Sequence, residues 1–113
     1  MREITGAGGY SAPEAADHNH WIEHFRVPDL SVGTYSIPRG GIDDQTPHSE
    51  DEIYVVTSGQ ARLESGGDSV RVGPGSVVYV AAGEVHRFTD VAEDLAALVI
   101  FAPAYQTRGA RDR

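Results

Sequence analysis

The chain has 113 residues, which is enough for one domain of ordinary size, and it contains neither cysteine nor lysine. Disulfides, thiolate metal sites and lysine Schiff-base chemistry are therefore excluded. The net charge of −8 disfavours nucleic acid as a partner. Because no apolar run is long enough to span a bilayer and the first residues lack a signal-peptide pattern, we expect a cytoplasmic protein without a membrane partner.

Three parts are expected along the chain. Residues 1–20 are rich in Gly, Ala, Asn and Asp and show no hydrophobic periodicity, which predicts a flexible N-terminal arm or a strand-swapping extension. Residues 21–105 are expected to form the folded domain, and residues 106–113 a polar C-terminal tail. His18 and His20 lie on the arm, where we expect them to face solvent, although a role in metal binding or in capping the domain stays open.

Within the domain, runs of β-branched and aromatic residues alternate with turn signals. We expect a tight hairpin turn at Ser58 and Gly59, and further turns at residues 66–68 and 73–75. Strands are expected at residues 21–27, 30–37, 52–57, 60–64, 69–72, 76–80, 85–89 and 95–101. About eight short strands at this spacing predict an all-β sandwich or barrel.

Two histidines and one glutamate form a candidate metal site. His48 and Glu52 are four residues apart, an even separation that places both on one face of a strand, together with Tyr54. His86 is expected early in a later strand and would be the third ligand. Imidazole nitrogen and carboxylate oxygen are the usual ligands of divalent metals where thiolates are absent. A buried histidine hydrogen-bonded to a glutamate would give the same pattern without a metal.

Two motifs in this chain resemble those of the cupin family. The first motif comprises Gly40, five residues, Thr46-Pro47-His48, three residues, Glu52, six residues and Gly59. The second comprises Gly75, five residues, Ala81-Ala82-Gly83, two residues, His86, three residues and Asp90. The resemblance covers about residues 30–102 and is greatest to small, stand-alone bacterial members of the cupin-2 type.

The resemblance implies a single jelly-roll β-barrel of about eight or more antiparallel strands. It also implies one divalent metal ion (Fe, Mn, Ni or Zn) held by His48, Glu52 and His86, a small-molecule ligand or substrate inside the barrel, and a homodimer. The strand at residues 21–27 is a candidate for exchange between the two copies. Mononuclear metal enzymes of this family include dioxygenases, isomerases, lyases and cyclases, and other members only bind or sense ligands.

One departure from the family pattern affects the metal site directly. Thr46 stands where cupins usually have their first metal-binding histidine, and a threonine hydroxyl is a poor ligand for a transition metal. Either water or the side-chain carbonyl oxygen of Gln45 is a candidate replacement. On a regular strand, Gln45 would point to the face opposite His48 and Glu52, because it is an odd number of residues from both. Pro47 lacks a backbone donor for the ladder, however, and permits a bulge that would turn Gln45 towards them.

Other residues are candidates for contact with a substrate. Tyr54 and Phe88 share parity with the metal ligands, so they either line the pocket or fill the interior of a small barrel. Gln45 is a further candidate for substrate binding. For catalysis, Glu52 or Tyr54 is expected to move a proton. The acidic residues at positions 43, 44, 50 and 51 are expected to form solvated loops, and an extra metal ligand or a general base among them is the alternative.

Overall fold

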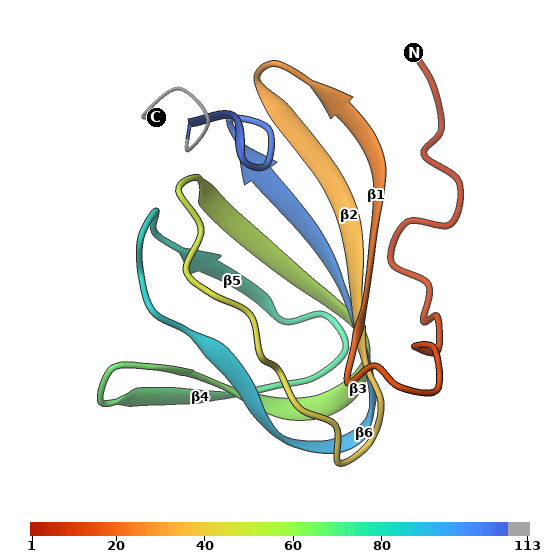
Figure 1. The fold of residues 1–113 in the computed structure, drawn as a ribbon, viewed down its shortest axis with the longest axis vertical. Coiled ribbons are helices and arrows are strands. Elements are labelled where there is room, and N and C mark those ends of the chain that lie inside the picture. The colour runs from red at the N-terminus through yellow and green to blue at the C-terminus, as the bar shows by residue number, and fades with distance from the viewer. Residues whose placement is uncertain (109–113) are drawn as a thin grey trace.

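The computed structural model describes residues 1–108 and contains one antiparallel sheet of six strands. The strands are β1 (His20–Val27), β2 (Leu30–Ile37), β3 (Asp51–Ser65), β4 (Asp68–Val72), β5 (Val77–Val80) and β6 (Arg87–Ala102). Their order is β1-β2-β6-β3-β4, and β5 pairs with the other half of β3. In Figure 1 the sheet curves around an interior, with β1, β2 and part of β6 facing β3 and β5. The expected all-β fold of antiparallel strands is confirmed.

The strand count of about eight is wrong, because two pairs of expected strands are continuous. The expected hairpin at Ser58 and Gly59 lies inside β3, and the strands expected at 85–89 and 95–101 both belong to β6. Gly59 has a φ of +87°, and the register against β6 shifts between Val56 and Arg62. A Cβ at Gly59 would lie 2.3 Å from the carbonyl oxygen of Asp94. The glycine therefore permits a bulge that bends the strand instead of reversing it.

The interior side chains come from alternate positions of the long strands. Members of this apolar core include Ile37, Tyr54, Val56, Leu63, Val72, Leu95, Ala97 and Val99. Ile37 and Leu95 are fully buried, and burying an aliphatic side chain of this size stabilises a fold by roughly 1.5–3 kcal/mol. The same alternation buries Glu52 on β3, two residues before Tyr54. The strand pattern that builds the core therefore also carries a carboxylate into the interior.

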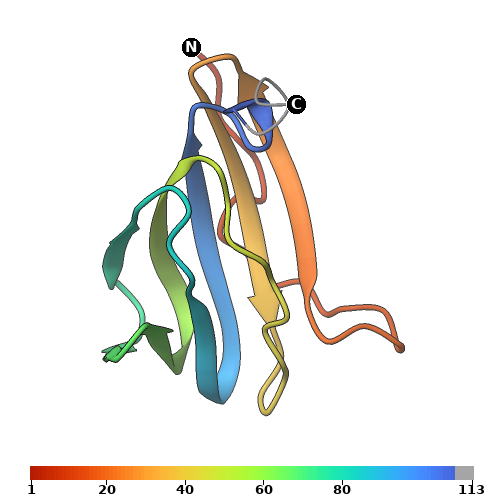
Figure 2. The same ribbon diagram turned by 60° about the vertical axis from the view of Figure 1, so that its left-hand side comes forward.

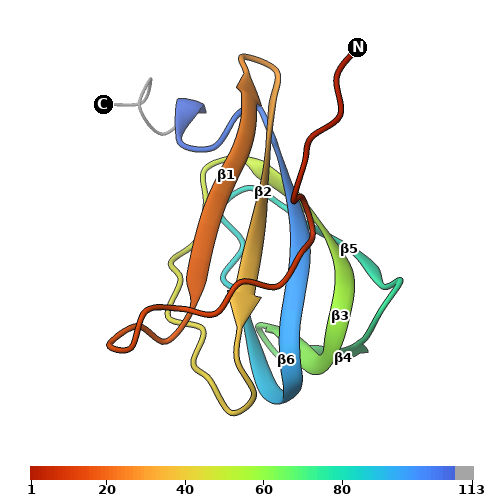
Figure 3. The same ribbon diagram turned by 90° about the vertical axis from the view of Figure 1, so that its right-hand side faces the viewer.

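The N-terminal segment before β1 lies against the outer face of the sheet. The Gly8 amide donates to Thr34 Oγ1 at 2.8 Å, and the Ser11 amide donates to Ser36 Oγ at 3.1 Å. Figure 3 shows this segment crossing β6, β2 and β1. Thr34 and Ser36 lie on β2, which is buried along nearly its whole length because both of its faces are covered. The flexibility expected of residues 1–20 stays a prediction.

The segment after β6 turns back towards the hairpin that joins β1 and β2 (Figure 2). The Ala104 amide donates to the carbonyl of Pro28, and Arg26 donates to the carbonyl of Tyr105 at 2.7 Å. Of the expected tail, residues 109–113 lie outside the described residues. Within residues 1–108, no helix has the length and apolar character needed to cross a membrane.

Candidate functional site

Three side chains converge at one end of the interior. His48 comes from the loop before β3, Glu52 from the start of β3, and His86 from the residue before β6. One ligand atom from each lies within 4.8 Å of the other two. His86 Nε2 is 3.0 Å from Glu52 Oε1, and His48 Nε2 is 3.8 Å from Glu52 Oε2. The structure thus brings together the three residues that the sequence analysis selected as metal ligands.

The expected placement of His48 and His86 on strands is wrong. Neither residue belongs to a strand, so the even spacing of His48 and Glu52 does not set their common direction. The loop backbone sets it instead, and the carbonyl of His48 accepts a hydrogen bond from the Gly83 amide at 2.6 Å. This contact ties the loop of the first motif to the turn before His86.

The protonation of His86 follows from its neighbours. Its Nδ1 lies 2.7 Å from the carbonyl oxygen of Glu84, which can only accept, so Nδ1 carries a proton. In the neutral ring, Nε2 therefore presents a lone pair towards Glu52. A metal-binding histidine is commonly oriented by such a bond from its other nitrogen to a backbone carbonyl.

Glu52 is buried at the same point with an incomplete set of partners. Its side chain is only 2 % exposed, and Oε1 has no hydrogen-bond donor among the described residues. At 3.0 Å, Glu52 Oε1 and His86 Nε2 can form a hydrogen bond only when Nε2 carries a proton. A carboxylate oxygen that faces an imidazole lone pair in the interior is costly unless a proton or a cation lies between them. The donor set, two nitrogens and a carboxylate, fits a divalent metal ion.

The two histidines differ in how the site affects their pKa. For His86, burial lowers the pKa, but the Glu52 carboxylate and the Glu84 carbonyl outweigh it, so the pKa is raised. For His48, burial lowers the pKa and outweighs the attraction of Glu52. The site therefore holds one neutral imidazole and favours a positive charge at the other, beside Glu52.

Gln45 lies beside the cluster, whereas Thr46 is exposed. Gln45 Oε1 is 2.8 Å from His48 Nε2, and Tyr54 donates its hydroxyl to the same oxygen at 3.2 Å. Tyr54 Oη also lies 3.1 Å from His86 Nε2. Gln45 can point towards the cluster despite its position in the sequence, because the loop is not a strand and its side chains do not alternate between two faces.

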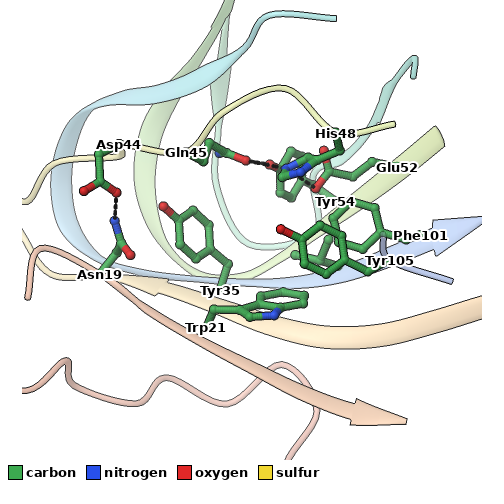
Figure 4. Close-up of a pocket in the computed structure, with 11 residues that line it drawn as sticks. Asn19, Trp21, Tyr35, Asp44, Gln45, His48, Glu52, Tyr54, Phe101 and Tyr105 are labelled. Carbon is green, nitrogen blue, oxygen red and sulfur yellow. Dashed lines mark hydrogen bonds and ion pairs between the residues drawn. The ribbon is translucent and has the colours of Figure 1, made fainter. Parts of the chain in front are cut away.

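A pocket of about 180 Å³ opens next to His48 and Glu52 (Figure 4). Aromatic side chains dominate its wall, and none of the described residues that line it is an arginine. The lining residues are Asn19, Trp21, Tyr35, Asp44, Gln45, His48, Glu52, Tyr54, Val99, Phe101 and Tyr105. Phe88 is not among them, because it is buried behind Tyr54 with the two ring centroids 4.9 Å apart.

Sequence reasoning missed three of these aromatic residues as parts of the pocket: Trp21, Phe101 and Tyr105. Trp21 pairs with Tyr35 across β1 and β2, and Phe101 continues the alternation of buried residues in β6. Strand parity was therefore a usable signal for Phe101. Tyr105 follows the last strand and gave no signal, yet its ring stacks on Phe101 with centroids 4.7 Å apart.

The expectation of solvated acidic loops is wrong for Asp43 and Glu50. Asp43 is 5 % exposed and accepts hydrogen bonds from the Tyr35 hydroxyl and the Phe88 amide, each at 2.7 Å. Glu50 is 1 % exposed and accepts from the amides of Gln106 and Arg108 at 2.9 and 3.0 Å. Both carboxylates are buried because backbone and side-chain donors surround them.

The histidines near the N-terminus lie apart from the cluster. His18 is exposed, and neither His18 nor His20 belongs to a group of ligands among residues 1–108. His24 is hydrogen-bonded to Thr34 Oγ1 at 2.7 Å on the outer face of the sheet. The candidate metal ligands that the described chain groups together are His48, Glu52 and His86.

Comparison with known proteins relates the chain to others of this architecture. It is 42 % identical over 92 residues to an uncharacterized protein of Streptomyces coelicolor, covering 81 % of this chain and 88 % of the relative. A double-stranded β-helix protein of Klebsiella pneumoniae is similar in structure, with a TM-score of 0.76, 19 % identity and 91 % of each chain covered.

Two named proteins share the fold at low identity. KdgF from Halomonas sp. has a TM-score of 0.70 at 21 % identity, covering 80 % of this chain and 85 % of its own. The DMSP lyase DddQ from Ruegeria pomeroyi has a TM-score of 0.69 at 21 % identity, covering 90 % of this chain and 54 % of its own. The model of the cupin domain matches residues 33–101, which include both motifs and all three candidate ligands. The chain is therefore a member of the cupin family.

Proposed function

We propose that this protein is a mononuclear divalent-metal cupin that acts on a small organic molecule bound in the aromatic pocket. The observation that carries the proposal is the buried Glu52 Oε1, which has no donor among the described residues and faces the Nε2 lone pair of His86 whenever that ring is neutral. His48, Glu52 and His86 would hold the ion. When bound, the ion would polarise a substrate oxygen or bind dioxygen, the chemistry that an incompletely coordinated ion supplies.

Tyr54 is proposed to supply a proton or a hydrogen bond to the substrate. Burial, together with the charge of Glu52, raises the pKa of Tyr54 well above its ordinary value of 10. The phenol therefore keeps its proton at neutral pH, and its hydroxyl is a donor and not a base. It lies 3.1 Å from His86 Nε2, within reach of an oxygen held at the cluster.

The pocket favours a neutral or cationic substrate. Its described lining contains the carboxylates of Asp44 and Glu52 and no arginine, so an anionic substrate would find no charged partner except the metal. Trp21, Tyr35 and Tyr105 offer apolar and π surface, which suits a flat or cationic organic group. Lyase chemistry is within the class proposed, since a DMSP lyase shares this fold.

A non-catalytic ligand-binding or sensor protein is the second candidate. It is favoured by the exposed Thr46 at the place of the first family histidine, because a weakened metal site suits a binding protein. Turnover separates the two functions: a sensor would bind ligand and metal without converting the ligand.

The first test is the metal content of protein purified without a histidine tag. We expect about one divalent ion per chain, and a rise in melting temperature when Mn²⁺ or Zn²⁺ is added to protein stripped with EDTA. His86→Ala should remove this rise, whereas the matched variant His18→Ala should keep it. Absence of both the ion and the rise in the unmodified protein would contradict the proposed function.

A homodimer stays a prediction from the sequence. Among the described strands, β1 is the outermost on its side of the sheet, so its second edge is available for pairing with another copy. Light scattering should report twice the mass of one chain, and a monomer at micromolar concentration would contradict the dimer.

A further inference from the structure

The side chain of Gln45 occupies a defined position although it belongs to a loop. Its Oε1 lies 2.8 Å from His48 Nε2, on the side of the cluster that the pocket opens onto (Figure 4). Its Nε2 lies 2.6 Å from Asp43 Oδ2. Because a carboxylate accepts hydrogen bonds and cannot donate them, the amide nitrogen must face Asp43 and the amide oxygen must face the cluster.

Asp43 is itself held by the fold. Its Oδ1 accepts hydrogen bonds from the Tyr35 hydroxyl at 2.7 Å and from the backbone amide of Gln45 at 3.2 Å. Its Oδ2 accepts from the Phe88 amide at 2.7 Å in addition to Gln45 Nε2. Tyr35 belongs to β2 and Phe88 to β6, so this buried carboxylate connects the loop to two strands. The direction of Gln45 Oε1 is therefore set by the sheet.

The spacing of donor atoms also fits a ligand. Two donors bound at right angles to an ion at about 2.1 Å lie about 3 Å apart. Gln45 Oε1 lies 2.8 Å from His48 Nε2, and Glu52 Oε1 lies 3.0 Å from His86 Nε2. In the metal-free protein, the contact between Gln45 Oε1 and His48 Nε2 is a hydrogen bond donated by His48 Nε2.

We propose that Gln45 Oε1 is the fourth protein ligand of the metal, in place of the histidine missing at Thr46, and that Asp43 is its positioning residue. This inference rests on the proposed function, because it assumes that His48, Glu52 and His86 bind an ion. Replacing an imidazole by an amide oxygen gives two nitrogen and two oxygen donors. Oxygen donors suit harder divalent ions such as Mn²⁺.

The test measures Mn²⁺ affinity from the electron paramagnetic resonance signal of the free ion, on the full chain purified without a tag. Gln45→Met keeps the length of the side chain but removes the oxygen, and a thioether is a poor ligand for Mn²⁺. We expect its affinity to fall at least about tenfold, the usual size of an effect on a metal site. The exposed Thr46→Val is the matched control from the next position and should bind Mn²⁺ like the unmodified protein.

The role of Asp43 is tested by a double-mutant cycle. Asp43→Asn places an amide against hydrogen-bond donors, so it should release Gln45 and lower Mn²⁺ affinity about tenfold. In the Gln45→Met background, the same change should lower the affinity no further, because the ligand it positions is gone. An equal loss in both backgrounds would overturn the positioning role. If Asp43→Asn does not fold, Gln45→Met alone still decides whether Gln45 is a ligand.

The visible absorption of bound Co²⁺ adds a readout of the ligands themselves, because the ligand-field bands depend on the atoms bound to the ion. We expect the ligand-field bands of Gln45→Met to differ from those of the unmodified protein. If Gln45→Met keeps both the Mn²⁺ affinity and the Co²⁺ bands, Gln45 is not a ligand, while the three-residue site stands. If the unmodified protein binds neither ion, the proposed function itself fails, and the inference fails with it.

Discussion

Glu50 and Glu52 are two residues apart and equally buried, but they differ in the hydrogen-bond donors around their carboxylates. Glu50 accepts hydrogen bonds from two backbone amides of the segment that follows β6. Glu52 has an oxygen with no donor among the described residues and faces an imidazole. A buried carboxylate whose partners are in place stabilises the fold, whereas one without them destabilises it until a cation binds. Burial alone therefore does not distinguish a structural acid from a functional one, but the partners do.

The largest effect is expected at Glu52, measured with and without metal. A metal present at a thousand times its Kd stabilises the unmodified protein by about 4 kcal/mol. Glu52→Gln should lose nearly all of this increment, measured by urea unfolding with Mn²⁺ and with EDTA. In EDTA the variant should be at least as stable as the unmodified protein, because the uncompensated charge is gone. A clear loss of stability in EDTA would show that Glu52 has a structural role like that of Glu50.

Glu50→Gln should give the opposite result in the same experiment. The variant replaces one of the two carboxyl oxygens that accept from the Gln106 and Arg108 backbone amides with an NH₂ group, which should destabilise the protein by about 1–3 kcal/mol in EDTA. The metal increment should stay at its unmodified value, because Glu50 is not part of the cluster. If Glu50→Gln also lost the stabilisation by metal, Glu50 would contribute to metal binding, and its role would not differ from that of Glu52.

Metal affinity should rise with pH, because the metal competes with a proton for His86. The pKa of His86 is raised, so near and below its ordinary value of 6.5 the ring is protonated and the metal must displace that proton. Below the raised pKa, one displaced proton lowers the affinity about tenfold for each unit of falling pH. Because the pKa of His48 is lowered, its ring is already neutral near pH 7 and releases no proton there. Calorimetry in buffers of different ionisation enthalpy counts the protons, and an affinity independent of pH between 5.5 and about 6.5 would contradict this assignment.

The smallest effect is expected for the charge preference of the pocket. Trp21 is the chain's only tryptophan and lines the pocket, so its fluorescence reports ligands directly. In metal-free protein, benzoate should bind about tenfold more weakly than benzyl alcohol, which corresponds to about 1.4 kcal/mol of repulsion from Asp44 and Glu52. Benzyltrimethylammonium should bind at least as well as the alcohol. Tighter binding of benzoate would show that the pocket selects anions.

The fold was predictable where the local pattern and the global structure agree. β2 begins and ends at the residues expected from its alternation and flanking turns. The error at Ser58 and Gly59 arose because a glycine with positive φ serves a bulge as readily as a hairpin turn. The bulge is distinguished from a hairpin turn by the close packing of the Asp94 carbonyl on Gly59. Asp94 is distant in sequence, and the pairing of β3 with β6 brings it there.

The candidate metal ligands were predictable from the sequence, but the residues that surround and orient them were not. Motif spacing selected His48, Glu52 and His86, although their convergence depends on loops and not on strand parity. The burial of Asp43 could not be foreseen, because one of its donors, the Phe88 amide, is 45 residues away in the sequence and the Tyr35 hydroxyl reaches it only across the turn after β2. An acidic run before a strand is usually solvated, and only the folded chain shows that donors surround two of its members.

The most direct test of the central claim is a crystal structure of the protein soaked with Mn²⁺ or Zn²⁺, with anomalous diffraction data collected near the absorption edge of the metal. We predict one strong anomalous peak bounded by Glu52 Oε1, His48 Nε2 and His86 Nε2, the atoms that meet around the unpartnered carboxylate. A structure of the soaked protein without a peak at this position would contradict the metal site.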